Sequence, residues 1–138
     1  MTHEIDCGWR GDMAFAARID GHELMLDADP AFGGRDAGPR PKALTLVSLA
    51  GCTGMDVVSI LKKMREPVSW FNVKVRGELT EEHPKTYASI AVVYQFKAAD
   101  GLNDENVRKA IELSQERYCG VNALLKKAVP VAHEVEYL

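Results

Sequence analysis

The sequence contains few residues of the kinds that mark a metal site or a disulfide-rich protein. Its 138 residues include three cysteines and four histidines, and no two of them follow C-x2-C or H-x3-H spacing. A structural zinc site is therefore not expected. Three cysteines are also too few, and odd in number, for the disulfide framework of a small secreted domain.

The sequence also lacks a basic surface and a long apolar run. The 17 Lys and Arg residues and 20 Asp and Glu residues are mixed along the chain and give a net charge of −3. Without a basic stripe between aromatic residues, nucleic-acid binding is not expected. The start of the chain has no secretory signal pattern, and the nearly apolar run 43–51 is too short to span a bilayer. We therefore expect a soluble, cytoplasmic protein with no membrane partner.

What the chain does contain is enough apolar material for one core. Apolar residues make up 46% of the sequence, which argues against disorder. The length suits one domain, and no repeat, low-complexity tract or linker divides it. We expect a single domain over residues 1–138.

Alternating apolar residues predict strands in three parts of the chain. Residues 1–28 contain two such runs around Asp20-Gly21, a typical hairpin turn, with a further strand before them. Residues 68–79 and 86–98 predict an antiparallel pair, and residues 131–138 predict a closing strand. The segment 29–41 is rich in glycine and proline and predicts a loop.

A long and unusually apolar helix is predicted from Pro41 to Arg65. Proline suits the first helical position, and basic residues suit the end. Gly51 and Gly54 should kink or break this helix, because glycine is unfavourable in a helix interior.

A second helix over 103–118, with Asn103 or Asp104 as its cap, is followed by a short helix that begins at Cys119. This order of elements predicts an α+β fold with antiparallel sheet. One small sheet cannot bury all sides of a helix that is apolar all round. A second copy of the chain could bury the remaining sides, which favours a homodimer.

The cysteines have two possible roles, packing and chemistry. In a reducing compartment most cysteines are small core residues, and that is the interpretation for Cys7, which lies in a predicted edge strand. Cys119 begins a helix, where unpaired N–H groups would stabilise a thiolate. Cys52 would have the same help if the long helix restarted after Gly51. Asp56 shares the face of Cys52, and its charge would oppose a thiolate there.

The segments "GPRPKALTLVSLAGCTGMDVVSILKKMR" and "LSQERYCGVNALLKKAVPVAHEVEY" resemble the family of osmotically inducible protein C (OsmC) and the organic hydroperoxide resistance proteins (Ohr). The resemblance covers residues 9–137 in the same element order. It implies an OsmC-like fold, in which antiparallel sheets wrap around long central helices of an intertwined homodimer.

The resemblance also implies a redox-active site. Cys52 matches the peroxidatic cysteine of the family and Cys119 the resolving one. The implied activity is a thiol-dependent peroxidase that reduces small organic hydroperoxides in oxidative-stress defence, with an external dithiol as reductant and no resident cofactor. An arginine holds the thiolate in the family, and Arg35 and Arg10 are the candidates here.

One departure leaves a second hypothesis open. The family's glutamate, which orients the arginine, stands nine residues before the first cysteine, and that position is Ala43 in this chain. The alternative is a non-catalytic dimer that binds a small ligand or serves as a structural protein, and that uses its cysteines only for packing.

Overall fold

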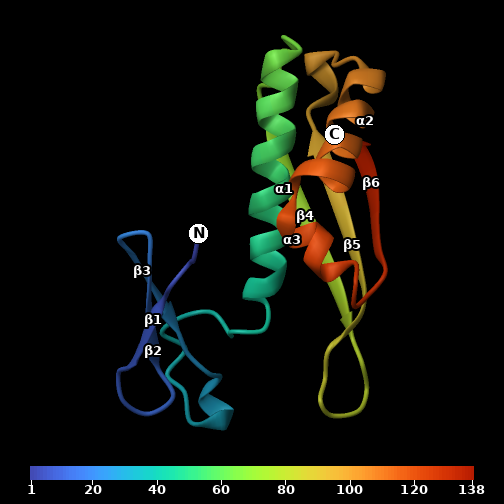
Figure 1. The fold of residues 1–138 in the computed structure, drawn as a ribbon. Helices are drawn as coiled ribbons and strands as arrows, with labels where there is room; N and C mark the ends of the chain where they lie inside the picture. The colour runs from blue at the N-terminus through green and yellow to red at the C-terminus, as the bar shows by residue number, and fades with distance from the viewer. The chain divides into compact units, whose positions relative to one another are not determined.

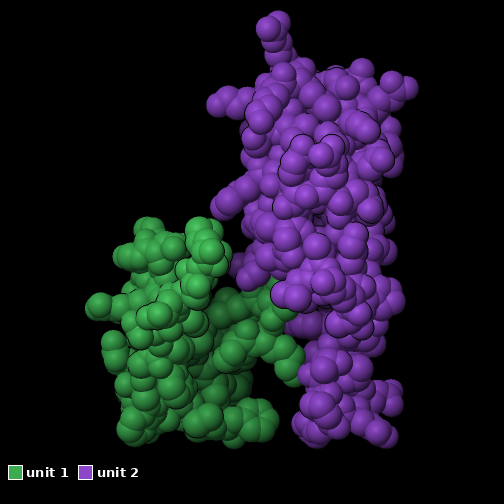
Figure 2. All heavy atoms as spheres, in the orientation of Figure 1, with its two compact units in different colours: residues 1–45 green, residues 46–138 purple.

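The computed structural model describes all residues 1–138, and the chain divides into two compact units, residues 1–45 and 46–138. Figure 1 shows the elements of each unit, and Figure 2 shows the two units in green and purple. Each unit contains one three-stranded sheet. The single domain expected over residues 1–138 stays a prediction.

The first unit is a small antiparallel meander in the order β1-β2-β3. Its strands are β1 (Asp6–Trp9), β2 (Phe15–Ile19) and β3 (His22–Leu26). The predicted hairpin is confirmed, since Asp20 and Gly21 connect β2 to β3 with φ values of 51° and 80°. Two consecutive positive φ values are typical of the turn that joins twisted strands in two residues. After β3 the chain enters a loop that includes a short 3-10 helix, η1 (Pro30–Phe32).

The second unit has the sheet order β4-β5-β6, formed by β4 (Phe71–Leu79), β5 (Tyr87–Phe96) and β6 (Val131–Tyr137). The predicted antiparallel pairing of β4 with β5 is confirmed. The last strand differs from the expectation, because β6 runs parallel to β5. The helices between them return the chain to the level where β5 began, as a crossover connection between parallel strands requires.

Three helices share one core with this sheet. They are α1 (Leu44–Lys63), α2 (Asp104–Leu113) and α3 (Gly120–Leu125), and a π-helical turn, η3 (Ser114–Tyr118), joins α2 to α3 (Figure 1). A 3-10 turn, η2 (Ala98–Asp100), follows β5. The core contains residues of α1, β5, α2 and the start of α3: Leu49, Val57, Leu61, Ile90, Val92, Tyr94, Phe96, Val107, Ala110, Ile111 and Cys119.

The long helix differs from its prediction in two ways. It begins at Leu44 rather than Pro41, because residues 41–43 form a turn in which the Leu44 N–H donates to the Pro41 carbonyl at 3.1 Å. It also continues without a break through Gly51 and Gly54. Tertiary packing explains the second glycine: a Cβ atom there would lie 3.3 Å from Cγ2 of Val73 on β4. Helix α1 approaches the sheet closely because Gly54 has no side chain.

By length and composition alone, α1 is apolar enough to cross a membrane, which the run 43–51 had not indicated. Core helices of soluble proteins meet the same criterion. One side of α1 packs in the core through Leu49, Val57 and Leu61. Packing against β5 and α2 therefore accounts for the apolar character of that side.

A chain of buried hydrogen bonds joins α1, β5 and η3. Oγ1 of Thr53 lies 2.6 Å from the Tyr94 hydroxyl and 2.8 Å from Oγ of Ser114. The Gln115 side-chain N–H donates to the Tyr94 hydroxyl at 2.6 Å, and the Ser114 hydroxyl donates to Oδ2 of Asp56 at 3.0 Å. Each hydroxyl has one proton, so donation runs from Gln115 through Tyr94, Thr53 and Ser114 to the Asp56 carboxylate.

The substitution Thr53→Val tests whether this chain stabilises the fold. It keeps the shape of the side chain but removes the hydroxyl that accepts the Tyr94 proton and donates to Ser114. The Tyr94 and Ser114 hydroxyls, which are fully buried, would each lose a partner. We expect the free energy of unfolding, measured in urea, to fall by about 1–3 kcal/mol. Thr53→Ser keeps the hydroxyl and should cost less. No loss of stability in Thr53→Val would contradict the assigned role.

Candidate functional site

Cys52 lies inside α1, in a continuous helix. Its side chain is half-buried and packs against the core. The suggestion that the helix restarts after Gly51 is therefore wrong, and no free helix N-terminus lies beside this thiol. The residue is less buried than Cys119.

Cys119 lies at the junction of η3 and α3. Its N–H donates to the Ser114 carbonyl at 2.9 Å, which closes the π-helical turn. Its Sγ atom accepts the Asn122 N–H at 3.3 Å, so the prediction that Cys119 begins a helix is confirmed. A π-helical turn at the end of an α-helix is frequent at functional sites.

The prediction that the helix start stabilises a Cys119 thiolate is wrong, because the pKa of this thiol is raised. Cys119 is only 2% exposed, and the pKa of its thiol is raised to about 11, mainly by burial. The neighbouring Cys52 side chain and the charge of Asp56 contribute to the same rise. The single N–H bond from Asn122 lowers it but does not compensate. Desolvation therefore outweighs the helix N-terminus, and Cys119 stays protonated at neutral pH.

The fold brings three side chains together from distant parts of the sequence. The sulfur atoms of Cys52 and Cys119 and a carboxylate oxygen of Asp56 all lie within 4.8 Å of one another. The two cysteines are 67 residues apart in the sequence, and both are free thiols in the structure. A disulfide has a sulfur–sulfur distance of about 2.05 Å, so the two side chains would have to approach modestly and pass two electrons to an oxidant to form the bond.

Asp56 connects this thiol pair to the buried hydrogen-bond chain. Its Oδ2 atom accepts the Ser114 hydroxyl at 3.0 Å, a structural hydrogen bond within one chain. Ser114 is a member of the site that the sequence did not reveal. The only signal was a hydroxyl residue on the apolar face formed by Val107 and Ile111.

A surface pocket of about 480 Å³ lies next to the site and has Asp56 in its lining. The lining residues come from the second half of α1, the end of α2 and η3: Asp56, Ser59, Ile60, Lys63, Leu113 and Tyr118. It has apolar walls, one cation and one carboxylate. Asp56 belongs to both the pocket and the thiol group, so the pocket lies directly beside the two cysteines.

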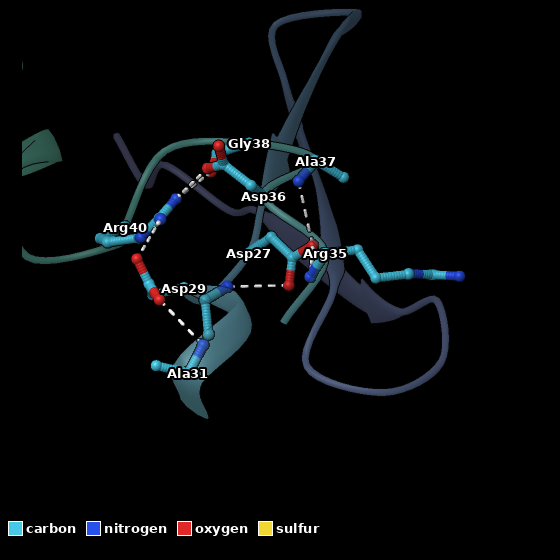
Figure 3. A network of polar contacts seen from close by, with 9 residues as sticks. Asp27, Asp29, Ala31, Arg35, Asp36, Ala37, Gly38 and Arg40 are labelled. Carbon is cyan, nitrogen blue, oxygen red and sulfur yellow. Dashed lines mark hydrogen bonds and ion pairs between the residues drawn. The ribbon is translucent and has the colours of Figure 1, made fainter. Parts of the chain in front are cut away.

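Arg35 lies on a loop of the first unit that a buried aspartate fixes (Figure 3). Asp27, 3% exposed, accepts the backbone N–H groups of Arg35 and Ala37 at 3.1 Å and of Ala28 at 2.8 Å. These bonds, led by that from Ala37, hold the pKa of Asp27 below its usual value. This role could not be predicted from the sequence, because an aspartate before a loop is more often exposed.

The two candidate arginines are exposed in the first unit. The Arg35 guanidinium lies 3.6 Å from the Asp12 carboxylate, and exposed ion pairs of this kind contribute little to stability. Arg10 follows β1, and its N–H donates to the Ala14 carbonyl at 2.8 Å. Ala43, at the position of the family glutamate, is exposed in the turn before α1. Cys52 and Cys119 belong to the second unit, and an arginine partner for Cys52 stays a prediction.

The raised pKa of Cys119 predicts slow alkylation at neutral pH, because the thiolate is the nucleophile. In reduced protein kept with a metal chelator, iodoacetamide should modify exposed Cys7 first. The rate at Cys119 should still rise as the pH increases toward about 11. Mass spectrometry of the peptides measures both rates in one sample. A rate at Cys119 that levels off near neutral pH would show that its thiol is not desolvated.

Known proteins resemble this chain in both sequence and fold. The sequence model of the family described as OsmC-like protein matches residues 33–134. Protein YhfA of Escherichia coli K12 is 36% identical over 116 residues, which cover 84% of this chain and 83% of YhfA.

Solved structures give the same result. A hypothetical protein from Aquifex aeolicus VF5 has a TM-score of 0.83 at 28% identity, covering 100% of this chain and 98% of its own. The organic hydroperoxide resistance protein OhrB of Bacillus subtilis shares the fold with a TM-score of 0.67 at 17% identity, covering 98% of each chain. The expected resemblance and α+β fold class are confirmed. The chain belongs to the OsmC-like protein family, and together with its two adjacent thiols this indicates a redox function.

Proposed function

We propose that the protein is a thiol-dependent peroxidase that reduces small organic hydroperoxides through Cys52 and Cys119. The observation that carries this proposal is the convergence of the two sulfurs, within 4.8 Å, from residues 67 apart in the sequence. Packing alone does not require two thiols to face one another beside a pocket. Oxidative-stress defence in the cytoplasm is the matching biological role.

Burial supports Cys52 as the attacking thiol. It is half-buried, whereas Cys119 is buried and protonated at neutral pH. The Cys52 thiolate attacks the distal oxygen of the hydroperoxide and breaks the O–O bond. One oxygen stays on sulfur as a sulfenic acid, and the other takes a proton and leaves in the alcohol.

Cys119 then resolves the sulfenic acid. Its sulfur displaces the hydroxyl of the Cys52 sulfenic acid, water leaves, and a disulfide forms between the two residues. An external dithiol reduces this disulfide by exchange and is itself oxidised to a disulfide. The burial of Cys119 suits this second step, because a protected thiol does not react with the peroxide first.

The substrate preference is supported by the pocket. Ile60 and Leu113 give it apolar walls next to Asp56. Organic hydroperoxides bury an apolar body there, whereas hydrogen peroxide has none to bury. Arg35 and Arg10 remain the candidates for holding the Cys52 thiolate. The loop that contains Arg35 is held in place by its hydrogen bonds to Asp27.

Thiol counting tests the peroxidase. Reduced protein mixed with cumene hydroperoxide should lose two thiols quickly, and it should lose them more slowly with hydrogen peroxide. Cys52→Ser should abolish the fast phase, and Cys119→Ser should leave a sulfenic acid that a dimedone-type reagent traps. Cys7→Ser is the matched control and should react like the parent, because Cys7 is exposed on a separate strand.

The opposite result would favour the second hypothesis. If the parent and both variants lose thiols slowly and equally, the cysteines have a packing role. The pocket next to Asp56 would then be the place to search for a bound ligand.

We further propose that the protein is a homodimer through α1. Val47, Met55 and Val58 are 61%, 73% and 43% exposed, and with Gly51 they form one stripe on the helix. The stripe lies on another side of α1 from the buried residues. An apolar stripe of this length is typical of a surface that a second copy covers.

The substitution Met55→Lys tests the dimer. Met55 is largely exposed in one chain, so the change should leave the fold intact but place a charge in the proposed interface. We expect sedimentation analysis to show a dimer for the parent and a shift toward monomer for Met55→Lys. Glu112→Lys, exposed on α2, is the control and should sediment like the parent. A monomeric parent would overturn the proposal.

A further inference from the structure

The group formed by Cys52, Asp56 and Cys119 has the composition of a site for a soft divalent metal ion. Two sulfurs and one carboxylate oxygen are ligands that Zn²⁺ prefers. The sequence did not suggest such a site, because its ligands follow no C-x2-C spacing. The fold supplies them from α1 and from the start of α3.

The geometry is close to that of a tetrahedral zinc site. With Zn–S bonds of about 2.3 Å and Zn–O bonds of about 2.1 Å, ligand atoms lie about 3.5–3.8 Å apart. The three donor atoms here lie within 4.8 Å of one another. Shifts of about an ångström, within the reach of side-chain rotation, would bring all three to bonding distance.

The surroundings of the carboxylate support a ligand role. Asp56 is oriented by the Ser114 hydroxyl at 3.0 Å, and Ser114 in turn contacts Thr53 at 2.8 Å in the buried chain. Outer hydrogen bonds of this kind orient metal ligands and tune their affinity. Asp56 also lines the surface pocket of about 480 Å³, so solvent reaches the carboxylate side of this group.

We propose that the reduced protein binds one Zn²⁺ ion through Cys52, Cys119 and Asp56, with a fourth position open to water. The ion, with two positive charges, compensates most of the charge of two thiolates and one carboxylate. Binding of the ion does not depend on the peroxidase activity.

A metal ion and a disulfide exclude each other at this site, because both use the same two sulfurs. If the proposed peroxidase function holds, oxidation releases the ion. The two zinc-bound thiolates, one organic hydroperoxide and two protons give the disulfide, one alcohol, one water and free Zn²⁺. The metal would then keep the thiols reduced until a peroxide arrives.

Titration with Co²⁺ tests the site directly, because a cobalt ion bound by thiolates absorbs light through sulfur-to-metal charge transfer. Reduced protein should bind one equivalent with this absorption, and Zn²⁺ should displace it. Cys52→Ser should abolish the charge-transfer band or weaken it strongly. Asp56→Asn should reduce the affinity by at least about 10-fold. Cys7→Ser is the matched control and should bind like the parent.

Three results would overturn the site. They are the absence of charge-transfer absorption in the parent, unchanged affinity in Cys52→Ser, and loss of binding in Cys7→Ser. Circular dichroism confirms that each variant is folded. If Cys119→Ser does not fold because it alters a buried position, Cys52→Ser and Asp56→Asn still decide the question. Metal binding without peroxidase activity, or the reverse, separates this proposal from the function above.

Discussion

The buried hydrogen-bond chain from Gln115 to Asp56 is the constraint on which the site depends. It crosses from η3 to β5 at Tyr94, to α1 at Thr53, and back to η3 at Ser114. Because hydrogen bonds are directional and these groups are buried, the chain permits one register between α1 and η3. That register places Cys52 and Asp56 of α1 beside Cys119, which follows η3 directly.

The chemistry of the thiols follows from a competition between burial and local polarity. Cys119 has a helix start and one N–H bond in its favour, but desolvation and its neighbours raise its pKa to about 11. Cys52 has no helix start, yet it is less buried. The two cysteines therefore have different environments, which suits different roles in one reaction. In the proposed metal-bound state, an ion at the same place would compensate the negative charge of the two sulfurs and the carboxylate.

Local patterns in the sequence predicted the elements well. The Asp20-Gly21 turn, the alternation of β4 and the helix start at Cys119 all depend on neighbouring residues, and each was confirmed. The family resemblance, carried by the segments around the two cysteines, was also confirmed. What failed depends on contacts between distant residues. Propensity alone predicted a kink at Gly54, whereas its packing on Val73 keeps α1 continuous.

The site shows the same limit of local reasoning. Cys52 and Cys119 were singled out as residues, but their proximity and the raised pKa of Cys119 follow from the tertiary fold. The parallel direction of β6 follows from the crossover through α2 and α3, which no strand pattern reveals. Asp27 and Ser114 were missed. The Asp27 carboxylate binds N–H groups of an irregular loop that has no sequence period, and Ser114 binds a helix far away in the sequence.

Mapping the disulfide formed under mild oxidation tests the central claim most directly. The reduced, metal-free protein is oxidised with diamide, digested without reduction, and its linked peptides are identified by mass spectrometry. The account predicts a link between Cys52 and Cys119, with Cys7 left as a free thiol. A preferred link that includes Cys7, or no link between Cys52 and Cys119 in folded protein, would contradict it.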